Sequence, residues 1–149
     1  MTKDVMISIR GLQFMDDDSD DEIETLQRGQ YYEKNCSRFL IFDEYMEGFK
    51  EPAKNVMRFK EKEMTLTKRG LINVQLDFEE GKKNLTSYRT PYGVMMLGVD
   101  TRRISLEETP DELTLKIDYV LEANYEFVAD CQISVCARSV GSSQEAFHE

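Results

Sequence analysis

The groups that could do chemistry in this chain are carboxylates, tyrosines and thiols, because histidine is almost absent. The single histidine, His148, is the penultimate residue. A Ser-His-Asp triad, a Cys-His pair or a histidine-based zinc site needs an ordered histidine in a cleft. We therefore assign no catalytic residue. An enzyme would have to work without histidine, through interior carboxylate and tyrosine groups.

The three cysteines, Cys36, Cys131 and Cys136, match no redox or zinc motif. No C-x-x-C pair is present, and the five-residue spacing of the last two places them on opposite faces of a strand. An odd number of cysteines without framework spacing is typical of a reducing compartment. The sequence also has no signal-peptide pattern, and no apolar run of the roughly 20 residues that a membrane helix requires. It predicts a cytoplasmic protein with no membrane partner.

The acidic run Asp16–Glu22 has part of the pattern of a calcium-binding loop. Aspartates occupy its first, third and fifth positions, as in an EF-hand. The sixth position, however, is Asp21 where the loop needs glycine, and the twelfth is Gln27 where a bidentate glutamate belongs. We expect a solvated loop here, and neither a metal nor another cofactor in the protein.

The net charge of −10 argues against nucleic-acid binding, which depends on neutralising phosphates with lysine and arginine. The charge is uneven, since residues 50–89 hold 10 basic and 6 acidic side chains. Two explanations stay open for this segment. Its strands either lie beside acidic strands and are neutralised within the fold, or form a basic face for an anionic ligand.

The strongest structural signal is an alternation of apolar and polar residues between Leu113 and Ala123. The apolar positions of one parity are Leu113, Leu115, Ile117, Tyr119, Leu121 and Ala123. Such a pattern is typical of a strand with one buried and one solvated face. Eleven residues exceed the usual five or six of a strand. A strand of this length suits a sheet that closes on itself.

Similar strand signals recur along the chain with short connections between them. We expect strands near 5–10, 23–33, 37–47, 55–69, 72–78, 85–89, 97–106, 113–123 and 127–137. Changes of parity predict a bulge or tight turn near residues 61–63 and a bulge near residues 100–102. Short turns suffice only for antiparallel pairing, and closure removes the exposed edges of a meander. The sequence therefore predicts an all-β, closed antiparallel meander barrel of about 8–10 strands. It forms one domain over residues 1–140, with a flexible tail at 141–149.

Several short motifs are similar to those of a known family. They are Tyr31-Tyr32-Glu33, Lys68-Arg69-Gly70, the turn from Phe78 to Gly81, Thr90-Pro91-Tyr92-Gly93 and the long closing strands. In this order and spacing they resemble the YwiB-like family, a group of small bacterial proteins of unknown function. The resemblance spans about residues 5–138. It implies a calycin-like or lipocalin-like barrel, and it supplies no activity and no catalytic residue.

Four residues are candidates for binding a ligand inside such a barrel. Glu44 shares the parity of its apolar neighbours and is expected to point inward, where an unpaired carboxylate is costly. Tyr32 and Tyr119 would line the same space, each offering a hydroxyl on an apolar ring. Arg89 would supply a positive group at the open end of the barrel. The alternative for Glu44 is that it faces solvent or pairs structurally with an arginine.

We expect a non-enzymatic binding protein, either for a small apolar or anionic ligand or for a protein partner. The alternatives are a structural or interaction module with a solid barrel, and the histidine-independent enzyme described above. The bulky inward residues between Leu113 and Leu121 favour a largely filled interior. A pocket of about 300 Å³ or more would separate the first possibility from the second. A monomer and a homodimer are both compatible with the sequence.

Overall fold

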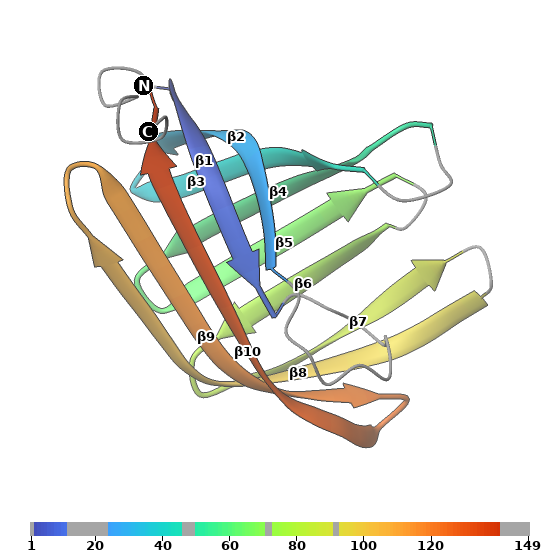
Figure 1. Cartoon of the computed structure of the whole chain (residues 1–149). Helices are drawn as coiled ribbons and strands as arrows, with labels where there is room; N and C mark the ends of the chain where they lie inside the picture. Colours follow the sequence, from blue (N-terminus) through green and yellow to red (C-terminus); the bar gives the residue numbers. More distant parts are fainter. Residues whose placement is uncertain (1, 12–23, 46–49, 71–72, 91–92, 141–149) are drawn as a thin grey trace.

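Ten strands account for most of residues 2–11, 24–45, 50–70, 73–90 and 93–140, which a computed structural model of the chain describes (Figure 1). They are β1 (Thr2–Arg10), β2 (Glu24–Lys34), β3 (Ser37–Glu44), β4 (Ala53–Lys60), β5 (Glu63–Arg69), β6 (Val74–Glu79), β7 (Lys83–Thr90), β8 (Gly93–Glu108), β9 (Glu112–Ala123) and β10 (Glu126–Ser139). The acidic run 16–22 and the tail 141–149 lie outside the described residues. No helix of the described part of the chain could span a membrane.

The strands form one sheet that curves around a common interior. The order is β6-β5-β4-β3-β2-β1-β10-β9-β8-β7, and all pairs of hydrogen-bonded neighbours in it are antiparallel. Because β1 pairs with β10, the first and last strands close the meander on themselves, as blue β1 beside red β10 shows in Figure 1. The predicted meander barrel and its number of strands are confirmed.

Closure is incomplete at one place, between β6 and β7. The described residues of these strands share a single bridge, Asn73 to Arg89. Elsewhere a side chain takes the place of the backbone ladder, because Asn84 Nδ2 donates to the Asp77 carbonyl oxygen at 3.1 Å. The barrel is therefore nearly closed rather than fully closed.

The two predicted irregularities are present. The β8–β9 register shifts between Thr101 and Arg103, which is a β-bulge at the expected position. The parity change in 55–69 comes from a tight turn at residues 61–62 between β4 and β5. A further register shift between Phe127 and Ala129 on β10 had no signal in the sequence.

Apolar side chains pack the interior of the barrel. Leu40, Met57, Leu66 and Leu76 lie opposite one another across β3 to β6, and each is 0 % exposed. Burying one such side chain contributes about 1.5–3 kcal/mol. On β9 the residues of the predicted apolar parity from Leu113 to Leu121 are buried, as expected.

The basic strands β4 and β5 lie beside one another, with an acidic residue facing a basic one at two positions and Lys54 facing Arg69 at a third. Asp43 on β3 lies opposite Lys54, and Glu63 lies opposite Lys60. Opposite charges at directly facing positions stabilise a sheet by a few tenths of a kcal/mol each, up to about 1. This register favours neutralisation within the fold, and a basic face for an anionic ligand stays a prediction.

Candidate functional site

One end of the barrel holds a pocket of about 360 Å³, which we call the mouth pocket. It lies where β1 begins, β10 ends and the turn between β8 and β9 passes, three segments that Figure 1 shows at the same end. Its lining residues are Lys3, Val5, Tyr31, Glu33, Glu108, Thr109, Pro110, Asp111, Glu112, Leu113, Ala137 and Ser139. The pocket exceeds the threshold of about 300 Å³ for a small-molecule site.

The floor of the mouth pocket is apolar. Val5, Leu113 and Ala137 are buried there, and each belongs to the core of the barrel. The ring of Tyr31 is half-buried and packs against the same core. The alternation of strands β1, β9 and β10 points these side chains inward, so the pocket is the end of the barrel interior rather than a groove on its wall.

An ion pair crosses the open end beside the pocket. Arg38 Nη2 on β3 lies 2.6 Å from Glu108 Oε1 on β8, and Arg38 Nε lies 3.9 Å from Glu33 Oε2. Burial works against the charge of Arg38, but the Glu108 carboxylate outweighs it and raises the pKa of this guanidinium. The pair links two strands that are not neighbours in the sheet.

Tyr31 is held as a neutral phenol in the wall of the pocket. Its hydroxyl donates to Glu33 Oε2 at 2.8 Å. Burial, followed by the bond to Glu33 and by the charges of Glu33 and Glu108, raises the pKa of Tyr31 to about 12. The carboxylates therefore impose a negative potential on this side of the pocket.

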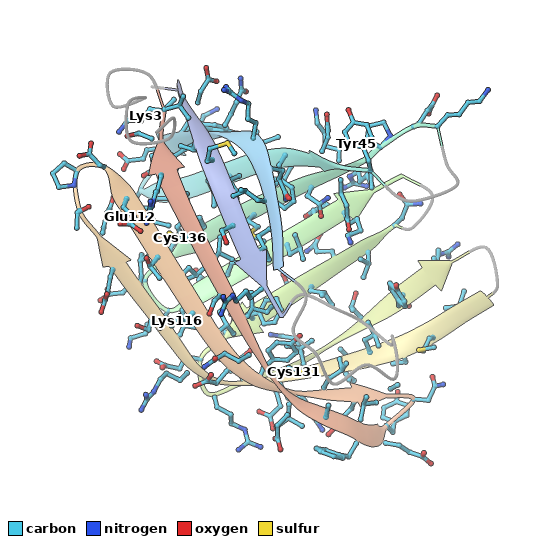
Figure 2. The ribbon with its side chains drawn as sticks, viewed as in Figure 1. Lys3, Tyr45, Glu112, Lys116, Cys131 and Cys136 are labelled. Atoms are coloured by element: carbon cyan, nitrogen blue, oxygen red, sulfur yellow. The ribbon has the colours of Figure 1, made fainter. Side chains whose placement is uncertain are left out.

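A second hydrogen-bonded group lies on the outer side of the rim. The Cys136 thiol donates to Glu112 Oε2 at 3.0 Å, and Arg138 Nε lies 3.3 Å from the same oxygen. Figure 2 shows Cys136 on β10 beside Glu112, with Lys3 at the same end of the barrel. Burial raises the pKa of both Cys131 and Cys136, so both remain thiols at neutral pH. Among the described residues, no group of three or more metal-ligating side chains is present.

Of the predicted site residues, Tyr32 lies on the outer face of the barrel. Its ring stacks on Phe39, with centroids 4.6 Å apart and planes within 5°. The register explains the difference, because Tyr31 lies opposite the buried Leu40 and Tyr32 lies opposite Phe39. The interior position expected for Tyr32 therefore belongs to Tyr31.

Arg89 also lies away from the mouth pocket. It is exposed on β7, next to the inward-facing Tyr88, and lies opposite Val94 at the start of β8. The pocket contains Glu108, which is the last residue of the same strand. Arg89 and the mouth pocket are therefore at opposite ends of β8.

Glu44 points into the barrel, as predicted, and has a lysine as its partner. Lys68 Nζ lies 2.8 Å from Glu44 Oε1, and Asn55 Nδ2 donates to the same oxygen at 3.3 Å. Lys68 is 7 % exposed and Asn55 is 0 % exposed. We call Glu44, Asn55 and Lys68 the inner polar cluster. Lys68 shares the parity of Met64 and Leu66, a signal that could have revealed it in the sequence.

Tyr119 lies inside the barrel, as predicted, and is 2 % exposed. Its ring meets Phe78 edge to face, with centroids 5.1 Å apart. Burial, followed by the Cys131 thiol opposite it on β10, raises its pKa well above the usual value, and its hydroxyl makes no hydrogen bond to an oxygen or nitrogen of a described residue. Of the four predicted residues, none lines the mouth pocket, and the structure does not bring the four together.

Comparisons with known proteins agree with this architecture. A family model described as "Domain of unknown function (DUF1934)" matches residues 7–135. The crystal structure of the YwiB protein from Bacillus subtilis is similar, with a TM-score of 0.77 and 18% identity over 95% of this chain and 94% of that chain. At this identity the likeness establishes the shared fold, and it confirms the resemblance seen in the sequence. No protein with a curated description matches the sequence.

Proposed function

The chain belongs to the DUF1934 family, whose description assigns no function, and we propose that it is a non-enzymatic binding protein for a small, partly apolar ligand. The observation that carries the proposal is the mouth pocket of about 360 Å³ with its buried apolar floor and polar rim. Ligand sites of small molecules have this composition, with apolar walls and a few placed polar groups.

The state of the rim carboxylates supports binding rather than catalysis. Glu108 is paired with Arg38, and Glu112 accepts from both Cys136 and Arg138. These partners lower the pKa of Glu112, whereas a general acid at neutral pH needs a raised one. The proposal also places the protein in the cytoplasm, which the odd number of cysteines and their three free thiols support.

The first test is to look for a ligand that accompanies the protein. The full chain is purified from its own host, analysed by native mass spectrometry and extracted for small molecules. We expect a bound mass that is released on denaturation. The variant Ser139→Phe fills the mouth pocket, because Ser139 lines it from the end of β10.

The matched control carries the same substitution on the same strand. Ser134 is also half-buried, but it lies opposite Arg10 and Lys116, on the outer face of β10. We expect Ser139→Phe to lose the bound mass and Ser134→Phe to retain it. Equal retention by both folded variants would contradict a site in the mouth pocket.

An interaction module is the second candidate, favoured by exposed apolar residues on the hairpin of β9 and β10. Tyr125 is 70 % exposed and Phe127 is 65 % exposed. Side chains of this kind mark protein-binding surfaces when they gather at one place. If this candidate is correct, Phe127→Ser abolishes capture of a partner from a native extract, whereas Ser139→Phe leaves capture unchanged.

A further inference from the structure

The residues that line the mouth pocket carry more negative than positive charges. Four lining residues are carboxylates and one, Lys3, is an ammonium. Two of the carboxylates are matched by arginines outside the lining, since Arg38 pairs with Glu108 and Arg138 with Glu112. Glu33 shares Arg38 with Glu108, and Asp111 pairs with no arginine of the described residues, so with Lys3 as the single lining ammonium the pocket keeps an excess of negative charge.

Glu33 and Asp111 lie on different segments of the rim. Asp111 is in the turn between β8 and β9 and is exposed, and its carboxylate makes no ion pair with another described residue. Glu33, at the end of β2, accepts the Tyr31 hydroxyl and is 3.9 Å from Arg38 Nε. A cationic group entering the pocket would therefore meet acceptor oxygens from both β2 and the β8–β9 turn.

Tyr31 favours a cation in two further ways. Burial and then the carboxylates of Glu33 and Glu108 raise its pKa to about 12, and the negative potential of these carboxylates would also attract a cation. The face of a tyrosine ring attracts an ammonium or guanidinium group through the ring quadrupole. The net charge of −10 on the whole chain adds long-range attraction for a small cation.

The apolar floor of the mouth pocket determines the chemistry of the part of the ligand that lies on it. Val5, Leu113 and Ala137 present only apolar atoms at the bottom of the pocket. An apolar group placed there is removed from water at about 25 cal/mol per Å². A ring or short hydrocarbon chain with its charge at the outer end suits this arrangement.

We infer that the mouth pocket takes a small amphipathic cation, with an ammonium or guanidinium group at the acidic rim and an apolar body on the floor of Val5, Leu113 and Ala137. This inference rests on the proposed function and names its ligand class. Lys3 is the group that opposes it, since its ammonium would prefer a carboxylate.

The test compares three probes of similar size that differ in one polar group: phenethylamine, 2-phenylethanol and 3-phenylpropionate. Each is titrated into the isotope-labelled full chain, and the shifts of pocket amides such as that of Leu113 give its Kd. We expect phenethylamine to bind at least about tenfold more tightly than 2-phenylethanol, and 3-phenylpropionate to bind most weakly. The preference should shrink at high salt, because the rim is exposed.

Two variants separate the charge from the shape of the pocket. In the double variant Glu33→Gln with Asp111→Asn, the amine should fall to the affinity of the alcohol, whose own Kd stays unchanged. Asp130→Asn, which removes an exposed carboxylate from the other half of β10, should leave the amine preference intact.

The outcomes distinguish this inference from the proposed function. Equal binding of amine and alcohol in the pocket overturns the cation and leaves a small-molecule site in place. Tightest binding of the carboxylate overturns the inference and identifies Lys3 as the dominant group. If no probe shifts the pocket amides, the cation is overturned as well. The proposed function then depends on the bound mass and its loss in Ser139→Phe.

Discussion

Arg38 on β3 and Glu108 on β8 form an ion pair of 2.6 Å across the open end of the barrel, 70 residues apart in the chain. β3 and β8 are not neighbours in the sheet, so this ion pair connects opposite walls of the barrel. We call the Arg38–Glu108 pair the strut. Its side chains are 28 % and 37 % exposed, which leaves the charges partly screened by water.

The strut should contribute modestly to stability. We expect a double-mutant cycle of Arg38→Met and Glu108→Gln to give a coupling energy of about 0.5–1 kcal/mol in urea unfolding. The cycle on Arg102 and Asp100, a more exposed pair at 3.3 Å on one strand, serves as the control and should give less. A coupling near zero for Arg38 and Glu108 would contradict the strut.

Loss of one or the other charge of the inner polar cluster should lower the free energy of unfolding by different amounts. Glu44→Gln replaces the carboxylate beside the nearly buried Lys68 by a neutral amide, and we expect a loss of about 2 kcal/mol in the free energy of unfolding. Lys68→Met leaves Glu44, which is 39 % exposed, free to be hydrated and should cost less. Urea unfolding of both variants measures the difference, and an equal or reversed order would refute a structural ion pair.

Tyr119→Phe should be neutral or stabilising by up to about 1 kcal/mol. The substitution removes a buried hydroxyl whose polar neighbour is the weakly hydrogen-bonding Cys131 thiol, and it keeps the ring against Phe78. Thermal unfolding measures this effect, with Tyr31→Phe as a control because the Tyr31 hydroxyl donates to Glu33. A clear loss of stability in Tyr119→Phe would show that its hydroxyl is satisfied in solution.

Tyr31 should make the protein less stable at alkaline pH. Its pKa is about 12 in the folded chain and about 10 when unfolded, so its contribution is complete below pH 10 and is lost as the pH rises toward 12. We expect Tyr31→Phe to lose less stability than the native chain between pH 10 and pH 12, measured by urea unfolding at each pH. The difference in absorbance at 295 nm between the native chain and Tyr31→Phe should show the Tyr31 transition near pH 12. A midpoint near pH 10 would contradict the hydrogen bond to Glu33.

The three thiols should react at different rates. Cys36 is exposed in the turn between β2 and β3, whereas burial raises the pKa of Cys131 and Cys136. We expect one fast and two slow thiols with Ellman's reagent in the folded chain, and three fast thiols in urea. Cys36→Ser should remove the fast phase alone, and a persistent fast phase in that variant would show that a barrel thiol is accessible.

Much of the fold could be predicted from local sequence patterns, as β9 shows. The alternation of apolar and polar residues in β9 identified its buried residues, and a change of parity in β8 located the bulge at Thr101. The pattern failed on β2, where Tyr31 and Tyr32 are both aromatic and the inward neighbours include Gly29 rather than an apolar side chain. Only pairing with Leu40 decides which tyrosine faces inward, and that pairing is set by tertiary structure.

The mouth pocket had no signal in the sequence because its parts come from distant segments. Val5, Tyr31, Leu113 and Ala137 lie on four strands, and each of them reads locally as an ordinary strand residue. Glu44 could be placed correctly because two apolar neighbours shared its parity. Its partner Lys68 was missed because basic residues near it are mostly exposed.

The gap in the ladder between β6 and β7 has a consequence for chain connectivity. Every other neighbouring pair of strands is held by a continuous ladder, including β1 with β10, and Val140 N donates to the Asp4 carbonyl oxygen at 3.0 Å. A circular permutant that joins residue 140 to residue 2 and opens at Gly81 would keep all nine ladders of the sheet. The native chain has its two ends between β1 and β10, whereas the permuted chain would have them between β6 and β7, where the described residues of the sheet form no backbone ladder. Both chain orders would build the same arrangement of strands.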